Sequence, residues 1–183
     1  ELARKKGICV MVDNTFGMGG YLFRPFEWGA HVSVHSATKW IGGHGTALGG
    51  VVVDGGNFDW TPEKYPLLAA PSESYHGLVY KEVFGPAAFA GRVRVDGLRN
   101  IGPAPSPFNS FLMLQGLETL SLRAERSCDN TLAVAEFLEK HPAVESVNYP
   151  GLKSNPYHEL GRKYLQHGFG GVLTFRVKGG FKA

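Results

Sequence analysis

The sequence contains little cysteine and lacks long apolar runs. Of its 183 residues only Cys9 and Cys128 are cysteines, and they show neither Cys-x-x-Cys nor Cys/His ligand spacing. A disulfide scaffold and a structural zinc site are therefore not expected. No apolar run approaches the length of a membrane span, and the first residues do not form a signal peptide, although a targeting segment could precede Glu1. We expect a cytoplasmic protein with no membrane partner.

Charge of one sign is also scarce. The chain has 19 Lys and Arg against 16 Asp and Glu, with a formal net charge of +3. The basic residues are scattered rather than gathered in a stripe, so nucleic acid is not an expected partner. A hydrophobic content of 43% is typical of a globular protein.

Both ends have the pattern of an interrupted domain. Residues 1–7 read as the end of a helix that runs into an apolar strand, and residues 171–177 read as a strand whose partners are not supplied. We therefore expect an internal fragment of a longer protein.

Three short β-rich runs predict an α/β sheet of buried strands. They cover residues 8–12, 32–35 and 50–53, and glycine-rich connections separate them. We expect residues 57–80 to form an extended surface loop. Residues 81–100 are expected to be partly helical, with an interruption at Gly85-Pro86.

A long helix is predicted over residues 108–140, with a strand over 144–149, a helix over 159–166 and the final strand after it. Apolar residues recur in the long helix at steps of three and four, which indicates one buried stripe; they are Leu117, Leu120, Ala124, Cys128, Leu132, Ala135 and Leu138. Such a helix often lies between domains. We place a boundary near Glu125, with residues 1–124 in a larger domain and 125–183 in a smaller one.

The residues that indicate chemistry are concentrated around Lys39. Ser36 and Thr38 closely precede this lysine at the end of a predicted strand, and glycines follow it. Hydroxyls and free backbone N–H groups suit a phosphate monoester, whereas a shielded amine can form an imine with an aldehyde. Both requirements match pyridoxal 5'-phosphate (PLP). Asp13, at the end of the neighbouring strand, could hold the pyridine nitrogen of this cofactor.

Each of these residues also has an ordinary interpretation. Lys39 could be a solvated surface charge, and Asp13 a turn residue. Residues 36–39 match the Ser-x-x-Lys pattern of serine acyl-enzymes, but that motif should open a helix and glycines follow here. His35 and His44 have no third ligand at a suitable spacing, so no metal is expected. The glycines at 42–45 lack the Gly-Lys-Ser/Thr ending of a nucleotide loop.

Longer motifs resemble a known family. Residues 12–16 (VDNTF), 36–45 (SATKWIGGHG) and 114–123 (LQGLETLSLR) look like the PLP-dependent enzymes of cysteine and methionine metabolism, and the resemblance covers essentially the whole chain. Within the family, residues 71–78 (PSESYHGL) and 148–152 (NYPGL) are most similar to the O-acetylhomoserine sulfhydrylases. Cystathionine γ-synthase, cystathionine lyases and methionine γ-lyase share the Asp13 and Lys39 motifs and stay open as alternatives.

The resemblance implies a fold-type-I PLP-dependent transferase, with part of the large α/β/α domain followed by the start of a smaller α/β domain. It implies that Lys39 carries the cofactor and moves protons, that Asp13 holds the ring nitrogen, and that Ser36 and Thr38 bind the phosphate. The implied reaction is γ-replacement of acetate by sulfide to give homocysteine, and the implied assembly is a homotetramer.

The same resemblance implies that parts of the site lie outside this chain. A phosphate-binding loop and an aromatic residue that stacks on the ring would precede Glu1. The arginine that binds the substrate carboxylate would follow Ala183, and Arg123 should not be substituted for it. The fragment alone is expected to be inactive.

Overall fold

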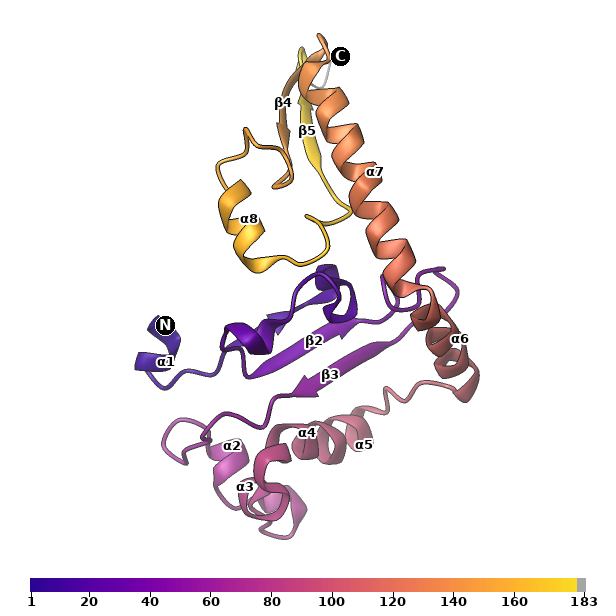
Figure 1. Ribbon diagram of the computed structural model, residues 1–183. Helices are drawn as coiled ribbons and strands as arrows, with labels where there is room; N and C mark the ends of the chain where they lie inside the picture. The colour runs from indigo at the N-terminus through magenta and orange to yellow at the C-terminus, as the bar shows by residue number, and fades with distance from the viewer. Residues whose placement is uncertain (181–183) are drawn as a thin grey trace.

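A computed structural model describes residues 1–180 of the chain, and Figure 1 shows its ribbon. The N-terminal part contains α1 (Leu2–Lys5), β1 (Met11–Asp13), η1 (Thr15–Gly20), η2 (Pro25–Trp28), β2 (Val32–Ser36) and β3 (Gly50–Asp54). Next come α2 (Pro66–Ala69), η3 (Glu73–Tyr75), α3 (Tyr80–Phe84), η4 (Gly85–Ala87), α4 (Ala88–Arg92), the π-helical η5 (Val93–Leu98) and α5 (Arg99–Ile101). The C-terminal part consists of α6 (Pro107–Glu118), α7 (Leu120–Lys140), β4 (Val144–Asn148), α8 (His158–Tyr164) and β5 (Thr174–Val177).

A three-stranded sheet in the order β1-β2-β3 carries the N-terminal part. β1 and β2 are parallel, with Asp13 opposite Val34, whereas β2 and β3 are antiparallel, with Ser36 opposite Gly50. The three predicted strands are therefore confirmed. They are not all buried, because the valines of β3 at positions 51–53 are exposed. The expectation of buried strands holds for the first half of β2, where Val32 is 0% and Ser33 1% exposed.

The segment from 57 to 80 is not an extended surface loop, so this prediction was wrong. It contains α2 and η3, and Trp60, Leu68 and Tyr80 form a buried cluster with Ala88. Aromatic side chains of this size stabilise a fold when they are buried together. Figure 1 shows the resulting helical layer, α2 to α5, below the sheet. The predicted interruption at Gly85-Pro86 is confirmed, because α3 ends at Phe84.

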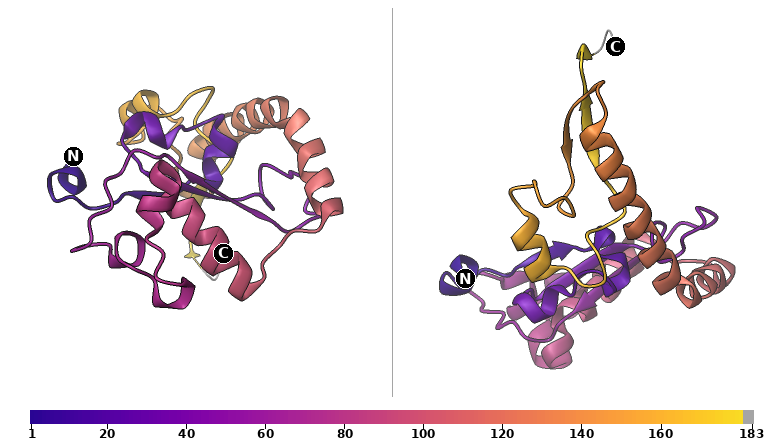
Figure 2. Two further views of the ribbon diagram at one scale, coloured as in Figure 1. Left: turned by 90° about the horizontal axis from the view of Figure 1, so that it is seen from below. Right: turned by 45° about the horizontal axis from the view of Figure 1, so that its top comes forward.

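The predicted single helix over residues 108–140 is also wrong, because two helices occupy it. The break lies at Thr119, whose φ and ψ of −105° and 7° are not helical. In α7, the expected stripe is buried at Leu120, Ala124, Cys128 and Ala135. Leu117, in α6, is 43% exposed. The right-hand view of Figure 2 shows that α7, β4 and β5, in orange and yellow, project from the sheet layer.

The final strand has a partner, contrary to expectation. β5 pairs antiparallel with β4, with Val147 opposite Phe175. Tyr149, Leu152 and Ala135 form the buried core between this two-stranded sheet and α7. A separate cluster joins α7 to the N-terminal part, because Met18 and Leu22 pack against Leu120, Ala124 and Cys128.

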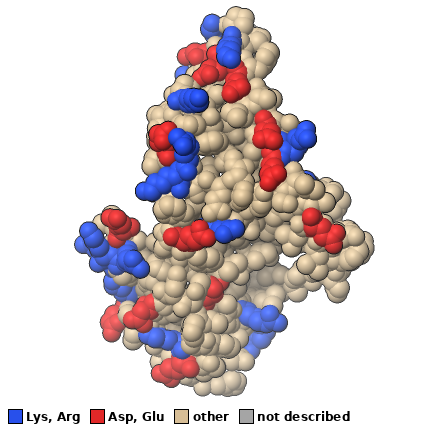
Figure 3. Space-filling model, viewed as in Figure 1, with Lys and Arg blue, Asp and Glu red and all other residues tan. Residues whose placement is uncertain are grey.

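Two features of the described residues bear on possible partners. No helix within residues 1–180 is both long and apolar enough to cross a membrane. On the face shown in Figure 3, basic and acidic side chains are interspersed.

Candidate active site

Asp13 ends β1 and is held by the turn that follows. Its Oδ1 atom accepts hydrogen bonds from the Thr15 hydroxyl at 2.6 Å and from the Thr15 backbone N–H at 3.0 Å. These bonds stabilise the carboxylate, so they lower the pKa of Asp13, and the nearby His35 acts in the same direction. No hydrogen bond from residues 1–180 reaches Oδ2. An ionised, exposed carboxylate with one available oxygen therefore stands at the strand end.

Thr15 connects this carboxylate to the neighbouring strand. Its hydroxyl donates to Asp13 and accepts a 2.8 Å hydrogen bond from the backbone N–H of Ser36, the last residue of β2. The same oxygen thus fixes the ends of β1 and β2 relative to each other. The adjacent Asn14 is 3% exposed and donates to the Phe23 carbonyl, so it supports the turn.

Lys39 lies in a tight turn after β2. Its backbone N–H donates to the Ser36 carbonyl at 3.2 Å, and its carbonyl accepts from the Gly43 N–H at 2.7 Å. Gly43 has a φ of +73°, a left-handed conformation that favours glycine. Because the residues after Ser36 form a turn rather than a helix, the Ser-x-x-Lys arrangement of a serine acyl-enzyme is not present.

Thr38 braces the same turn through Gly49, the residue before β3. Its hydroxyl accepts a 3.0 Å hydrogen bond from the Gly49 N–H and donates to the Gly49 carbonyl over 3.3 Å. The second bond is the longer one. The Thr38 hydrogen could therefore turn to another acceptor while the bond from Gly49 is kept.

Lys39 lines a hollow of about 660 Å³ between its own loop and the start of α7. The lining includes Thr15, Phe16, Lys39, Trp40, Arg123 and Arg126, and no acidic residue. Asp13 lines a neighbouring hollow of about 500 Å³, which also contains Phe16. The structure therefore brings Lys39 and Asp13 to adjacent cavities on either side of Phe16, whose side chain is 65% exposed.

Arg123 of α7 holds the lysine loop from the other side. Its guanidinium donates to the Trp40 carbonyl at 3.0 Å and to the Gly116 carbonyl at 2.7 Å, while Nε donates to the Thr119 hydroxyl at 3.1 Å. Partial burial lowers the pKa of Arg123. One side chain thus joins the loop after Lys39 to the break between α6 and α7.

His35 of β2 and His44 of the loop after Lys39 have separate environments. His35 Nε2 lies 2.9 Å from the Ser33 hydroxyl, and burial lowers the pKa of His35. His44 Nδ1 lies 2.7 Å from the Gly42 carbonyl. Among residues 1–180, no group of three His, Cys, Asp or Glu side chains is arranged to hold a metal ion.

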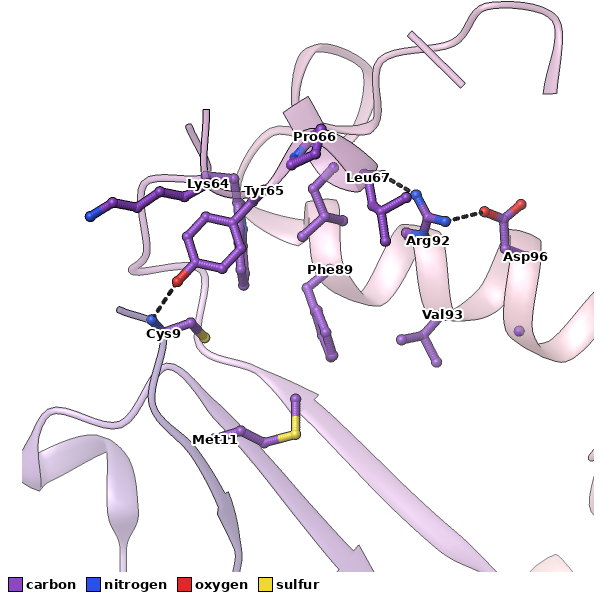
Figure 4. Close-up of a pocket in the computed structure, with 13 residues that line it drawn as sticks. Cys9, Met11, Lys64, Tyr65, Pro66, Leu67, Phe89, Arg92, Val93 and Asp96 are labelled. Carbon is purple, nitrogen blue, oxygen red and sulfur yellow. Dashed lines mark hydrogen bonds and ion pairs between the residues drawn. The ribbon is translucent and has the colours of Figure 1, made fainter. Parts of the chain in front are cut away.

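A larger hollow, of about 700 Å³, lies between the sheet and the helical layer (Figure 4), and Lys39 is not among its lining residues. Its walls come mainly from α2, α4 and η5, with Met11 of β1, and they are largely apolar. Arg92 pairs with Asp96 at 3.2 Å, and the Tyr65 hydroxyl accepts from the Cys9 N–H at 2.8 Å. Asp96 Oδ1, in contrast, is buried without a hydrogen-bond partner among residues 1–180. This hollow therefore offers mainly apolar contact, and the Cys9 thiol and the Asp96 carboxyl group are among its few polar or nucleophilic groups.

Two contributors to the site were missed in the sequence. Thr15 was assigned no role in the site, although a threonine two positions after an aspartate is able to cap its carboxylate. Arg123 was set aside, and no local pattern links it to Lys39, because 83 residues separate it from Trp40.

Comparison with known proteins agrees with the resemblance seen in the motifs. The family model described as "Cys/Met metabolism PLP-dependent enzyme" matches residues 1–183. Homocysteine/cysteine synthase of Kluyveromyces lactis is 57% identical over 97% of this chain, and O-acetyl-L-homoserine sulfhydrylase 1 of Thermus thermophilus is 54% identical over all of it. The chain spans 40% and 44% of the lengths of these two relatives.

A solved structure is similar across nearly the whole fold. The putative O-acetylhomoserine (thiol)-lyase of Campylobacter jejuni superposes with a TM-score of 0.89 and 40% identity, covering 97% of this chain and 44% of that one. That crystal structure contains a pyridoxyl-lysine monophosphate. The expected fold-type-I α/β architecture is confirmed by this likeness.

Proposed function

Because the chain belongs to the Cys/Met metabolism family of PLP-dependent enzymes, we propose that the full-length protein is an O-acetylhomoserine sulfhydrylase. It would make homocysteine and acetate from O-acetylhomoserine and sulfide. The observation that carries the proposal is the Lys39 loop, which presents a lysine to a hollow next to a carboxylate held ionised at a strand end. The choice of subgroup is supported by the names of the relatives in Kluyveromyces lactis and Thermus thermophilus.

The side chains present fit PLP. Asp13 keeps one oxygen available to accept from a protonated ring nitrogen, and Lys39 makes no ion pair with any residue between 1 and 180. Ser36 and Thr38 would donate their hydroxyls to the phosphate, with Thr38 giving up its long bond to Gly49. Lys39 would hold the cofactor aldehyde.

These residues have separate tasks in the proposed reaction. Bound PLP supplies an electron sink that makes protons next to the substrate amino group acidic. The Lys39 amine would take the α-proton and later return it. Asp13, with its low pKa, would keep a proton on the ring nitrogen by remaining ionised. Acetate leaves the γ-carbon of the substrate and sulfide takes its place.

A cytoplasmic homotetramer is part of the same proposal. The family resemblance supports the assembly. The small, polar substrates support the compartment. The division into domains at residues 1–124 and 125–183 also stays a proposal. Light scattering of the full-length protein tests the assembly, and a monomeric mass would contradict it.

Borohydride reduction of the full-length protein with PLP, followed by peptide mass spectrometry, tests the cofactor site. We expect a pyridoxyl adduct on Lys39 and its loss in Lys39→Ala. Soluble, folded protein without an adduct on Lys39 would refute the proposal. The substrate is tested separately with O-acetylhomoserine plus sulfide against cystathionine, and faster turnover of cystathionine would overturn the subgroup.

A further inference from the structure

A single arginine ties the lysine loop to the break between two helices. Arg123 uses three guanidinium nitrogens on four partners, because Nη2 also reaches the Ile41 carbonyl at 3.5 Å in addition to the bonds to Trp40, Gly116 and Thr119. Trp40 and Ile41 directly follow Lys39, so the bonds act on the segment that carries the lysine. In Figure 1 the loop between β2 and β3 reaches the junction of α6 and α7.

The surrounding chain is shaped to admit this contact. A Cβ atom on Gly43 would lie 2.4 Å from the Arg123 guanidinium carbon, and one on Gly116 would lie 2.3 Å from the Gly42 carbonyl oxygen. Both positions therefore need glycine for the close approach. The Gly116 carbonyl belongs to the last turn of α6, where carbonyls lack helical partners, and Arg123 supplies one.

The geometry points to Arg123 as a positioning residue for Lys39. It fixes the carbonyls of residues 40 and 41 against α6 and α7, and thereby the place from which the Lys39 amine reaches into its hollow. A planar guanidinium can serve several carbonyls at once, whereas a lysine ammonium is a point donor. Arg123 touches no reacting atom in this assignment, which rests on the proposed role of Lys39.

Hydrogen exchange of the full-length protein without PLP tests the clamp independently of the cofactor. The Gly42 and Gly43 amides donate to Ala37 and Lys39 within the loop, so their exchange reports its integrity. In Arg123→Met we expect their exchange to accelerate about tenfold or more, the size associated with lost hydrogen bonds to a charged group. Arg123→Lys should give an intermediate value.

Arg92→Met is the matched control. Arg92 also donates to a backbone carbonyl, that of Leu67, and pairs with Asp96, but it lies in the other hollow. The Arg92→Met variant should loosen the α2 region. It should leave the exchange rates of the Gly42 and Gly43 amides within about twofold of wild type. Unchanged exchange in Arg123→Met, or equal acceleration in Arg92→Met, would overturn the clamp. If Arg123→Met does not fold, Arg123→Lys decides between these outcomes.

The holoenzyme gives the second readout. We expect kcat of Arg123→Met to fall about tenfold with KM changed less than about threefold, because Lys39 moves protons rather than holding free substrate. Arg123→Lys should recover part of kcat. A rise in KM alone, or an unchanged kcat, would refute a positioning role. Borohydride labelling of wild-type Lys39 separates the two ideas, since its absence refutes the proposed function while the exchange result still judges the clamp.

Discussion

The Thr15 hydroxyl donates a 2.6 Å hydrogen bond to the Asp13 carboxylate and accepts one from the Ser36 backbone. Two parallel strand ends are therefore joined through one side-chain oxygen. The arrangement stabilises the ionised form of Asp13, and it couples the carboxylate to the beginning of the lysine loop. Thr15 thus contributes to the site without being one of its reactive groups.

Replacing Thr15 by valine should raise the pKa of Asp13 towards its ordinary value. A carboxyl whose folded pKa is depressed contributes stability above its unfolded pKa, and that contribution is lost as the pH falls through the folded pKa. As the pH falls, the protonation of Asp13 lowers the free energy of unfolding of the wild type. This decline should be smaller in Thr15→Val. Carbon NMR titration of the Asp13 carboxyl measures the shift. Thr15→Ser, which keeps the hydroxyl, should titrate like wild type, and an unchanged pKa in Thr15→Val would contradict the hydrogen-bond assignment.

Ser36→Ala and Thr38→Ala should differ in the protein without cofactor. The Thr38 hydroxyl bonds to Gly49 within the chain, whereas the bond of Ser36 to Thr15 uses its backbone N–H. We expect both variants to weaken PLP binding about tenfold, but only Thr38→Ala to lower the stability of the apoprotein, by about 1 kcal/mol. Fluorescence titration with PLP and denaturant unfolding measure the two effects. Equal apoprotein stability in both variants would show that the bond to Gly49 contributes nothing.

Gly116→Ala should destabilise the protein by about 1–3 kcal/mol, although alanine is the better helix former. The new Cβ would meet backbone oxygens of Ile41 and Gly42 at 2.5 and 2.3 Å, and backbone cannot yield as a flexible side chain does. Gly97→Ala is the matched control, because no atom lies within 4 Å of its added Cβ. It should be neutral or stabilising by up to about 1 kcal/mol. Denaturant midpoints with the reverse order would disprove the close approach of α6.

Tyr149 should give the protein a stability that declines in alkali. Its side chain is fully buried, its hydroxyl donates to the Gly170 carbonyl at 2.8 Å, and burial raises the pKa of Tyr149 to about 12. The unfolded state loses this proton near the ordinary tyrosine pKa of 10.0, so unfolding becomes more favourable as the pH rises from there to about 12.

Tyr149→Phe should remove that pH dependence and cost about 1 kcal/mol at neutral pH through the lost hydrogen bond. Urea unfolding at a series of alkaline pH values measures both effects. The same alkaline slope in wild type and variant would assign it to another group.

The local patterns were sufficient for the three N-terminal strands, and they named the candidate site residues at the strand ends, whose roles stay a prediction. Short β-branched runs gave β1, β2 and β3 within a few residues, and the Ser36 to Gly45 motif identified the lysine loop. The failures involve long-range packing. Trp60 and Leu68 are buried because they pack with Tyr80 and Ala88, which the mixed polar, aromatic and proline-containing sequence of residues 57–80 does not reveal.

The break at Thr119 has a similar origin. Neither proline nor glycine marks it, so the apolar period runs through it unchanged. The end of α6 is capped instead by Arg123 and lies against the carbonyls of residues 41 and 42. A contact between segments far apart in the chain thus ends a helix that its own sequence would continue.

The sequence by itself determined the family, the fold class and the identity of Lys39, Asp13, Ser36 and Thr38 as candidates, because these depend on residue type and short spacing. Only the tertiary structure decided that Thr15 joins Asp13 to Ser36 and that Arg123 holds the lysine loop. Hydrogen bonds between distant segments depend on how the backbone brings them together, and no local periodicity encodes that approach.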